Sequence, residues 1–85
     1  MALQMLYFAW VREAVGAGSE AVDPPTEVAN VSALLDWLSG RSTGHAAAFA
    51  DRERLRAAID QQFAALDASI AGATEIAIFP PVTGG

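Results

Sequence analysis

The most chemically distinctive part of this 85-residue chain is its C-terminal segment, Phe79-Pro80-Pro81-Val82-Thr83-Gly84-Gly85. Two consecutive prolines fix φ near −65° and cannot donate to a β-ladder, so they end any strand that reaches them and give a stiff, extended exit. Six extended residues span at most roughly 20 Å, which is enough to enter a pocket of another protein. Gly84 and Gly85 carry no side chains, so a narrow tunnel could close around their backbone.

The carboxylate of Gly85 is unhindered, but a carboxylate is a poor electrophile until one of its oxygens becomes a leaving group. An ATP-derived acyl adenylate would achieve this, and a sulfur donor could then displace AMP to leave a terminal thiocarboxylate with a nucleophilic sulfur. The chain has no cysteine, so the terminus is the only place where it could hold labile sulfur. We therefore interpret Gly84 and Gly85 as the reactive site; a frayed end without a role is the alternative.

Composition limits the classes of protein to consider. The length suits one small domain, and 53% apolar residues with no low-complexity tract indicate a globular chain. The formal charge is −5, so nucleic acid is a poor partner and a basic protein surface is a better one. The apolar N-terminal run is cut short by Arg12-Glu13, and no run could cross a bilayer, which predicts a cytoplasmic protein with no membrane partner.

The N-terminal half predicts two strands and a helix. Leu3 to Trp10 is aromatic and apolar without a breaker and predicts a strand, with Leu3, Met5, Tyr7 and Ala9 on one face. Val11 to Val15 predicts a short helical turn, which Gly16-Ala17-Gly18 ends. Ser19 to Asp23 predicts a second strand that pairs with the first as a hairpin.

The clearest helical pattern runs from Val31 to Ser39. Apolar residues recur there at i, i+3, i+4 and i+7, which gives one buried stripe; they are Val31, Leu34, Leu35 and Leu38. Asn30 is a suitable N-cap, and Gly40 is expected to adopt the left-handed conformation after the last turn.

Residues 46–71 support two interpretations. Alanine, arginine and leucine between Ala46 and Ala58 favour a long helix by propensity. The segments on either side of Asp60-Gln61 would equally suit a hairpin with a two-residue turn, because aspartate tolerates the positive φ that such a turn requires.

Glu75 to Phe79 predicts a last strand with Ile76 and Ile78 facing the helix. If the core faces of the first and last strands lie on the same side, Leu6, Phe8 and Phe79 form an exposed apolar patch beside the root of the tail. We predict that this patch docks a partner; coverage by a loop or extra core is the alternative.

The remaining polar residues offer no independent active site. Arg12 could pair with a partner's carboxylate or with the chain's own acids. His45 has no second ligand nearby, so we expect an exposed loop histidine and no metal site. The cluster Asp51-Arg52-Glu53-Arg54 is expected to be a solvated surface that compensates its own charge.

The ending from Phe79 to Gly85 resembles that of the small, sulfur-carrying subunit of molybdopterin synthase, the MoaD family. The opening Leu6-Tyr7-Phe8-Ala9-Trp10-Val11-Arg12-Glu13 resembles the family's first strand and the turn after it. Ala57-Ala58-Ile59-Asp60-Gln61 resembles its third-to-fourth strand hairpin, although the family often has Asn at the position of Asp60. The similarity extends over essentially the whole chain.

The resemblance implies an α+β, ubiquitin-like β-grasp domain at residues 1–79, with a mixed sheet on one main helix, and an extended Gly-Gly tail at 80–85. An E1-like, MoeB-like enzyme would use ATP to adenylate Gly85, with no cofactor bound by the chain itself. The tail, including Pro80, Pro81, Val82 and Thr83, would then enter the MoaE-like large subunit. There sulfur would pass to cyclic pyranopterin monophosphate to build the dithiolene of the molybdenum cofactor.

In that family the assembly is a heterotetramer, with small subunits at opposite ends of a large-subunit dimer. The chain would thus be the sulfur-donating subunit of a sulfurtransferase complex. Two alternatives stay open: a sulfur carrier for thiamine or cysteine synthesis, and a ubiquitin-like modifier joined to other proteins through Gly85. The chain has no lysine, so it could not form side-chain-linked polymers of itself.

Overall fold

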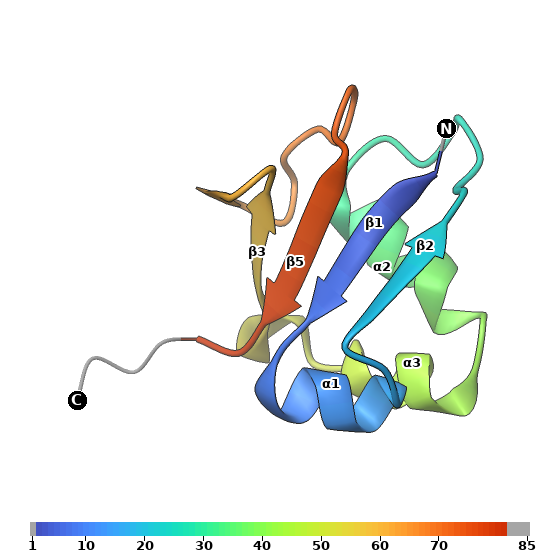
Figure 1. The fold of residues 1–85 in the computed structure, drawn as a ribbon, viewed down its shortest axis with the longest axis vertical. Helices are drawn as coiled ribbons and strands as arrows, with labels where there is room; N and C mark the ends of the chain where they lie inside the picture. Colours follow the sequence, from blue (N-terminus) through green and yellow to red (C-terminus); the bar gives the residue numbers. More distant parts are fainter. Residues whose placement is uncertain (1, 82–85) are drawn as a thin grey trace.

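The computed structural model describes residues 2–81, which form one mixed sheet packed on helices (Figure 1). The sheet has the strand order β2-β1-β5-β3-β4. Its strands are β1 (Leu3–Tyr7), β2 (Ser19–Val22), β3 (Arg56–Ile59), β4 (Gln62–Ala64) and β5 (Glu75–Phe79). The helices are α1 (Ala9–Val15), α2 (Val31–Ser39) and α3 (Thr43–Ala48), followed by the 3-10 turn η1 (Arg52–Arg54).

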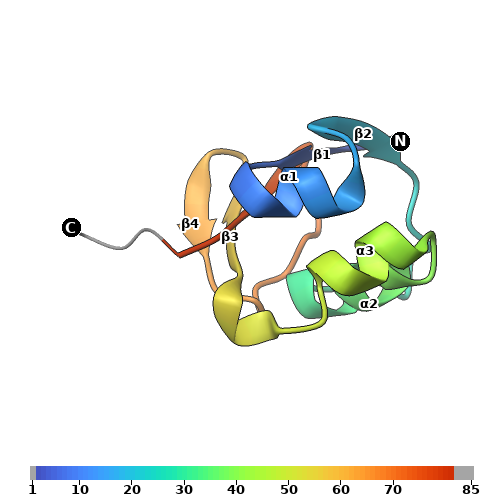
Figure 2. The ribbon, with the colours of Figure 1, turned by 90° about the horizontal axis from the view of Figure 1, so that it is seen from below.

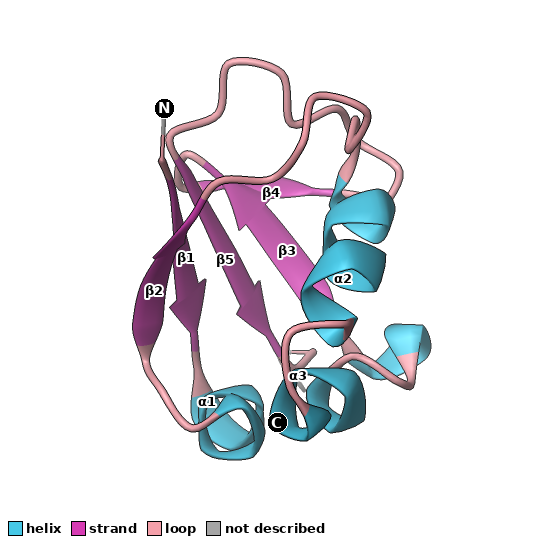
Figure 3. Ribbon diagram, turned by 90° about the vertical axis from the view of Figure 1, so that its right-hand side faces the viewer, coloured by secondary structure: helices cyan, strands magenta, loops and turns pink. Residues whose placement is uncertain are grey.

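The central pair of strands, β1 and β5, runs parallel, and every other neighbouring pair is antiparallel. Figure 3 shows α2 and α3 together on one side of the sheet, while the other side of the described chain carries no helix. We call this uncovered side the open face. The α+β architecture predicted from the sequence is confirmed. Within residues 2–81 no helix is long and apolar enough to span a bilayer.

Helix α2 supplies the helical half of the core. Its four predicted stripe residues have no exposed surface, and burial of each stabilises the fold by about 1.5–3 kcal/mol before entropy is subtracted. Asn30 caps the helix as predicted, because its side-chain oxygen accepts from the Ala33 amide at 2.8 Å. The sheet supplies the other half: Met5 lies beside Ile76, Tyr7 lies beside Ile78, and all four are buried.

The first strand is shorter than the sequence predicts. It ends at Tyr7, and α1 begins at Ala9, which has a φ of 54° and is exposed. A positive φ breaks the extended alternation, so Ala9 does not continue the core face of β1. The resulting turn lets Val11, with no exposed surface, enter the core.

The left-handed glycine after a helix is Gly16, not Gly40. Gly16 follows α1 with a φ of 92°, and its amide donates to the Arg12 carbonyl at 2.9 Å. Gly40 follows α2 with a right-handed φ of −81°, so the prediction for this residue is wrong. The chain keeps a helical turn at Gly40 because its amide still bonds to the Trp37 carbonyl, at 3.2 Å.

The ambiguous region 46–71 holds both a short helix and the hairpin. The helix α3 ends at Ala48, and the long helix favoured by propensity does not form. Strands β3 and β4 pair around Asp60 and Gln61, whose φ angles are 48° and 71°. Two consecutive positive φ angles define the tight hairpin turn that the alternative interpretation requires.

The prediction of an exposed loop histidine at position 45 is wrong. His45 lies in α3 and is only 7% exposed. Its Nε2 lies 2.6 Å from Glu20 Oε2, and its Nδ1 lies 2.7 Å from Ser42 Oγ. Both ring nitrogens therefore have partners, which makes burial of the imidazole tolerable.

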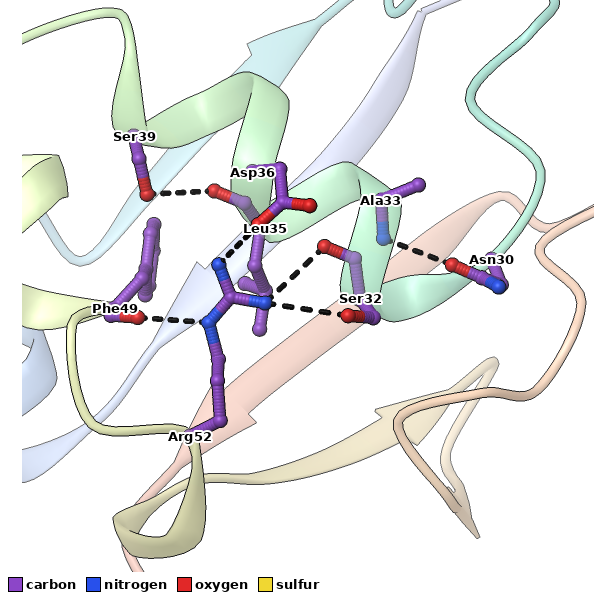
Figure 4. Close-up of polar contacts among 8 residues, drawn as sticks. All are labelled: Asn30, Ser32, Ala33, Leu35, Asp36, Ser39, Phe49 and Arg52. Atoms are coloured by element: carbon purple, nitrogen blue, oxygen red, sulfur yellow. Dashed lines mark hydrogen bonds and ion pairs between the residues drawn. The ribbon is translucent and has the colours of Figure 1, made fainter.

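The charged cluster at 51–54 does not compensate its own charge, because Arg52 reaches back to α2. Its guanidinium donates to Asp36 Oδ1 at 2.6 Å and to the Ser32 carbonyl at 3.3 Å, while its Nε donates to the Phe49 carbonyl at 2.7 Å (Figure 4). One arginine thus fastens η1 to the main helix and positions the start of β3.

Candidate functional site

The root of the predicted tail is the end of β5. Pro80 and Pro81 follow the strand directly, and both are partly buried. Neither can donate to a β-ladder, so the strand ends before them. Residues Val82, Thr83, Gly84 and Gly85 lie outside the described part of the chain, so their predicted roles as reactive and partner-binding residues stay predictions.

Strand β5 is held on both edges. It pairs with β1 through Gln4 to Tyr7 and with β3 through Arg56 to Ile59. Beyond the end of β1, the Phe8 amide still donates to the Ile78 carbonyl, at 3.3 Å. Strand β5 is therefore paired over four residues on each edge, as β1 is, and it gives Pro80 and Pro81 a rigid base.

The open face is apolar along a line that crosses the sheet. The pairing register places Leu6 beside Ala77, Ala77 beside Ala58, and Ala58 beside Phe63. Phe79 lies on the same face one step closer to the tail, since it alternates with the buried Ile78. Side chains that alternate with core residues must point away from the core.

Two large apolar side chains on this face are strongly exposed within residues 2–81: Phe8 at 50% and Phe63 at 83%. Phe63 packs against Phe79 with ring centroids 5.8 Å apart. We call Leu6, Phe8, Phe63 and Phe79 the open-face patch. The three members predicted from the sequence lie on this face as expected, but only Phe8 among them is strongly exposed, whereas Leu6 and Phe79 are partly buried; their role in docking stays a prediction.

Phe63 was not predicted as a member of the patch, although the sequence contains a pattern that could have identified it. If the two-residue turn Asp60-Gln61 is accepted, then Ala58 must pair with Phe63. Because Ala57 is buried, its neighbour Ala58 faces outward, and Phe63 must do the same. The choice between helix and hairpin therefore decided whether this residue could be found.

Asp60 ties the hairpin turn to the base of β5. Its Oδ1 accepts from Thr74 Oγ1 at 2.8 Å, from the Thr74 amide at 3.0 Å and from the Glu75 amide at 2.9 Å. These bonds, the Thr74 hydroxyl first among them, lower the pKa of the Asp60 carboxyl below its usual value. The ionised aspartate thereby fixes where β3 meets β5.

A second carboxylate joins β1, β2 and α3 on the helix side. Glu20 Oε2 accepts from the Tyr7 hydroxyl at 2.7 Å and contacts His45 Nε2. Burial raises the pKa of Glu20, but the bonds from His45 and Tyr7 and the nearby positive charges outweigh it, so the net shift is downward. Burial, and then the bond to Glu20, raise the pKa of the Tyr7 phenol above its usual range.

Arg12 lies on the surface of the domain. Arg12 is exposed, its guanidinium lies beside Gly18, and it forms no salt bridge with a carboxylate of residues 2–81, so the pairing with the chain's own acids is not found. The described residues contain no cluster of three metal-ligating side chains and no pocket. What residues 2–81 offer is a rigid strand that leads to Pro80 and Pro81 and an apolar open face beside it.

A five-stranded mixed sheet on one main helix, with β1 and β5 parallel and an apolar open face beside Pro80 and Pro81, defines a ubiquitin-like β-grasp fold. The ThiS family model matches residues 5–85, and the chain belongs to the ThiS family.

Two curated relatives match the chain over almost its entire length. Both are described as "Molybdopterin synthase sulfur carrier subunit". The protein from Escherichia coli (strain K12) is 36% identical over 83 residues, which is 98% of this chain and 99% of the relative. The protein from Haemophilus influenzae is 34% identical over the same shares.

Solved structures support the fold. SAMP1 from Haloferax volcanii superposes with a TM-score of 0.72 at 29% identity and covers 100% of both chains. A putative molybdopterin converting factor subunit 1 from Pyrococcus furiosus superposes with a TM-score of 0.74 at 23% identity, over 96% of this chain and 99% of the other, which is evidence for the fold alone.

Proposed function

We propose that this chain is the sulfur-carrier subunit of a molybdopterin synthase, with activated sulfur on the carboxylate of Gly85. One observation carries the proposal: a strand that is paired on both edges leads through Phe79-Pro80-Pro81 into Val-Thr-Gly-Gly, beside an apolar patch in which Phe8 and Phe63 are exposed. The curated relatives that match over the whole chain support this choice of pathway.

The proposed chemistry has two stages. An E1-like enzyme joins AMP from ATP to the Gly85 carboxylate, and pyrophosphate leaves. A sulfur donor then attacks the acyl carbon, so that a C–S bond forms while the bond to AMP breaks. In the large subunit the thiocarboxylate sulfur forms a bond to cyclic pyranopterin monophosphate; water then attacks the acyl carbon, the acyl C–S bond breaks, and the chain returns to the carboxylate form.

In this scheme the folded domain binds and positions but does not catalyse. The open-face patch docks the large subunit, and the β5 anchor fixes where the tail begins. Pro80 and Pro81 restrict the tail and so lower the entropy lost when it is captured. The glycine end lets it pass through a narrow channel. ATP serves the activating enzyme, and the chain needs no cofactor of its own.

The test is intact mass spectrometry after incubation with the activating enzyme, ATP and a sulfur donor. We expect replacement of one oxygen by sulfur at the C-terminus. A variant with one residue added after Gly85 is the control: it should fold with an unchanged melting temperature but acquire no sulfur and support no cofactor synthesis. If the extended variant still supports synthesis, the carrier function is wrong.

A second candidate function is protein modification, because another structure that matches, at 28% identity and a TM-score of 0.73, is titled small archaeal modifier protein 1 from H. volcanii. A modifier would form isopeptide bonds through Gly85 and appear as a ladder of conjugated proteins in cell extracts. Sulfur carriers for thiamine or cysteine synthesis would show the same mass change but would not bind the molybdopterin synthase large subunit.

A further inference from the structure

The two ends of the sheet differ in what they carry. Strands β1 and β5 finish side by side at Tyr7 and Phe79, and α1, α3, η1 and the start of β3 gather at this end, which we call the exit end (Figures 1 and 2). The opposite end is formed by the loops 23–30, 60–61 and 65–74, and we call it the far end.

Charge is divided unequally between these ends. All the arginines belong to segments at the exit end: Arg12, Arg41, Arg52, Arg54 and Arg56. Half of the ten acidic residues lie at the far end, where there is no basic side chain: Asp23, Glu27, Asp60, Asp67 and Glu75. The other five acids accompany the five arginines, so the side chains there sum to zero and the whole formal charge of −5 belongs to the far end.

Two arginines at the exit end, one of them beside the open-face patch, have no acidic partner in residues 2–81. Arg56 lies opposite Phe79 in the register of β3 and β5. Arg54 lies over the ring of Trp10, 4.6 Å from its centroid, and Trp10 follows Phe8 by two residues. Neither guanidinium is within 4.0 Å of a carboxylate in residues 2–81, whereas Arg52 is paired with Asp36.

We propose that Arg54 and Arg56 form a basic rim of the docking surface and that the partner's matching surface carries carboxylates around an apolar centre. This deepens the proposed function and rests on it. Rim charges contribute to the rate and orientation of encounter more than to final affinity. The net charge of −5 alone favours a basic partner, but that charge lies at the far end. An acidic partner surface would repel the far end, whereas the exit end is neutral overall and offers arginines without an acidic partner, so the carrier would approach with its tail root first.

The geometry favours protein carboxylates over a phosphate group as the occupant. Arg56 Nη1 already donates to the carbonyls of Glu53, at 3.1 Å, and Leu55, at 2.8 Å. Arg54 is stacked on an indole ring. The two guanidinium groups are each held by their own local contacts, and no pocket lies on the described surface, so nothing there resembles the convergent fork that holds a phosphate.

The experiment measures association of the full chain with the molybdopterin synthase large subunit of the same source by stopped-flow fluorescence across a series of salt concentrations. Arg54→Gln should slow association about three-fold at low salt and flatten the salt dependence. Arg54→Lys keeps the charge and should keep the rate. The matched control is Arg41→Gln, since Arg41 also stacks on a tryptophan, Trp37, at 5.4 Å but follows α2 on the helix side; it should leave the rate unchanged.

Equal effects of Arg54→Gln and Arg41→Gln on the association rate would mean that only net charge matters, and would refute the proposed basic rim. An association rate of the wild type that is independent of salt would refute it as well. Competition by inorganic phosphate that disappears in Arg54→Gln would also overturn it, in favour of an anion site. A wild-type chain that does not bind the large subunit at all contradicts the proposed function itself, which separates the two failures.

Discussion

Replacement of Phe63 by alanine separates a docking role of the open-face patch from a structural role. Phe63 is 83% exposed, so about one-sixth of its surface is buried in the free chain. Full burial of a phenylalanine is worth about 1.5–3 kcal/mol, and one-sixth of that is under about 0.5 kcal/mol. We therefore expect the free energy of unfolding of Phe63→Ala to change little, even with loss of the contact to Phe79.

Binding should respond far more strongly than folding. If docking covers the exposed five-sixths of Phe63, the lost burial is about 1.2–2.5 kcal/mol, which weakens the complex with the large subunit by roughly 7- to 60-fold. Isothermal titration calorimetry gives the dissociation constant, and thermal unfolding by circular dichroism gives the stability. Phe8→Asp should likewise leave the fold intact and weaken partner binding.

The matched control is Phe49→Ala, the same substitution at a phenylalanine that is 1% exposed. It should cost about 3–5 kcal/mol of stability, enough to unfold a small domain. If Phe63→Ala lowers the melting temperature as much as Phe49→Ala does, Phe63 is part of the core. If it binds the large subunit as tightly as the wild type, the patch does not dock this partner.

Three further substitutions test the fold around the site. The pKa of the Asp60 carboxyl is lowered in the folded chain, so its ionised form stabilises the fold above about pH 4. This contribution is lost as the pH falls through the pKa of the folded state. Asp60→Asn should retain the turn, and its midpoint of urea unfolding should fall less in acid than that of the wild type. Glu20→Ala leaves the Tyr7 hydroxyl and His45 without a shared acceptor and should cost about 2 kcal/mol in urea unfolding; an unchanged midpoint would show that water replaces it. Ala9→Gly relieves a φ of 54° and should stabilise the chain by about 0–1 kcal/mol in thermal unfolding, whereas a clear loss would mean that Ala9 is not strained.

The elements with strong local patterns were predicted at or near their true bounds. The helix Val31–Ser39 and the strand Glu75–Phe79 match the structure at both ends, because their periodicity agrees with their packing. Three members of the open-face patch were found by the same reasoning, since a strand that is apolar on both faces must expose one of them when a helix covers the other.

Other features depend on contacts between distant segments. Helix propensity in residues 46–58 is strong, but Ala57 and Leu55 are buried only if the chain turns into β3 beside β5, and that burial outweighs the local preference. His45 could be identified as buried only once α3 brought it to Glu20, which is 25 residues away in sequence. Phe63 depended on the same hairpin.

By itself, the sequence determined the strand-ending prolines, the side-chain-free glycine end and the amphipathic stripe of α2, because each follows from residue chemistry or local periodicity. The tertiary structure decided that the arginines gather at the end where β5 finishes, that a carboxylate binds both Tyr7 and His45, and that Phe63 joins the patch. These features arise from the pairing of strands far apart in the chain, and the free energy that selects such pairings comes from burial shared between segments, which no local pattern contains.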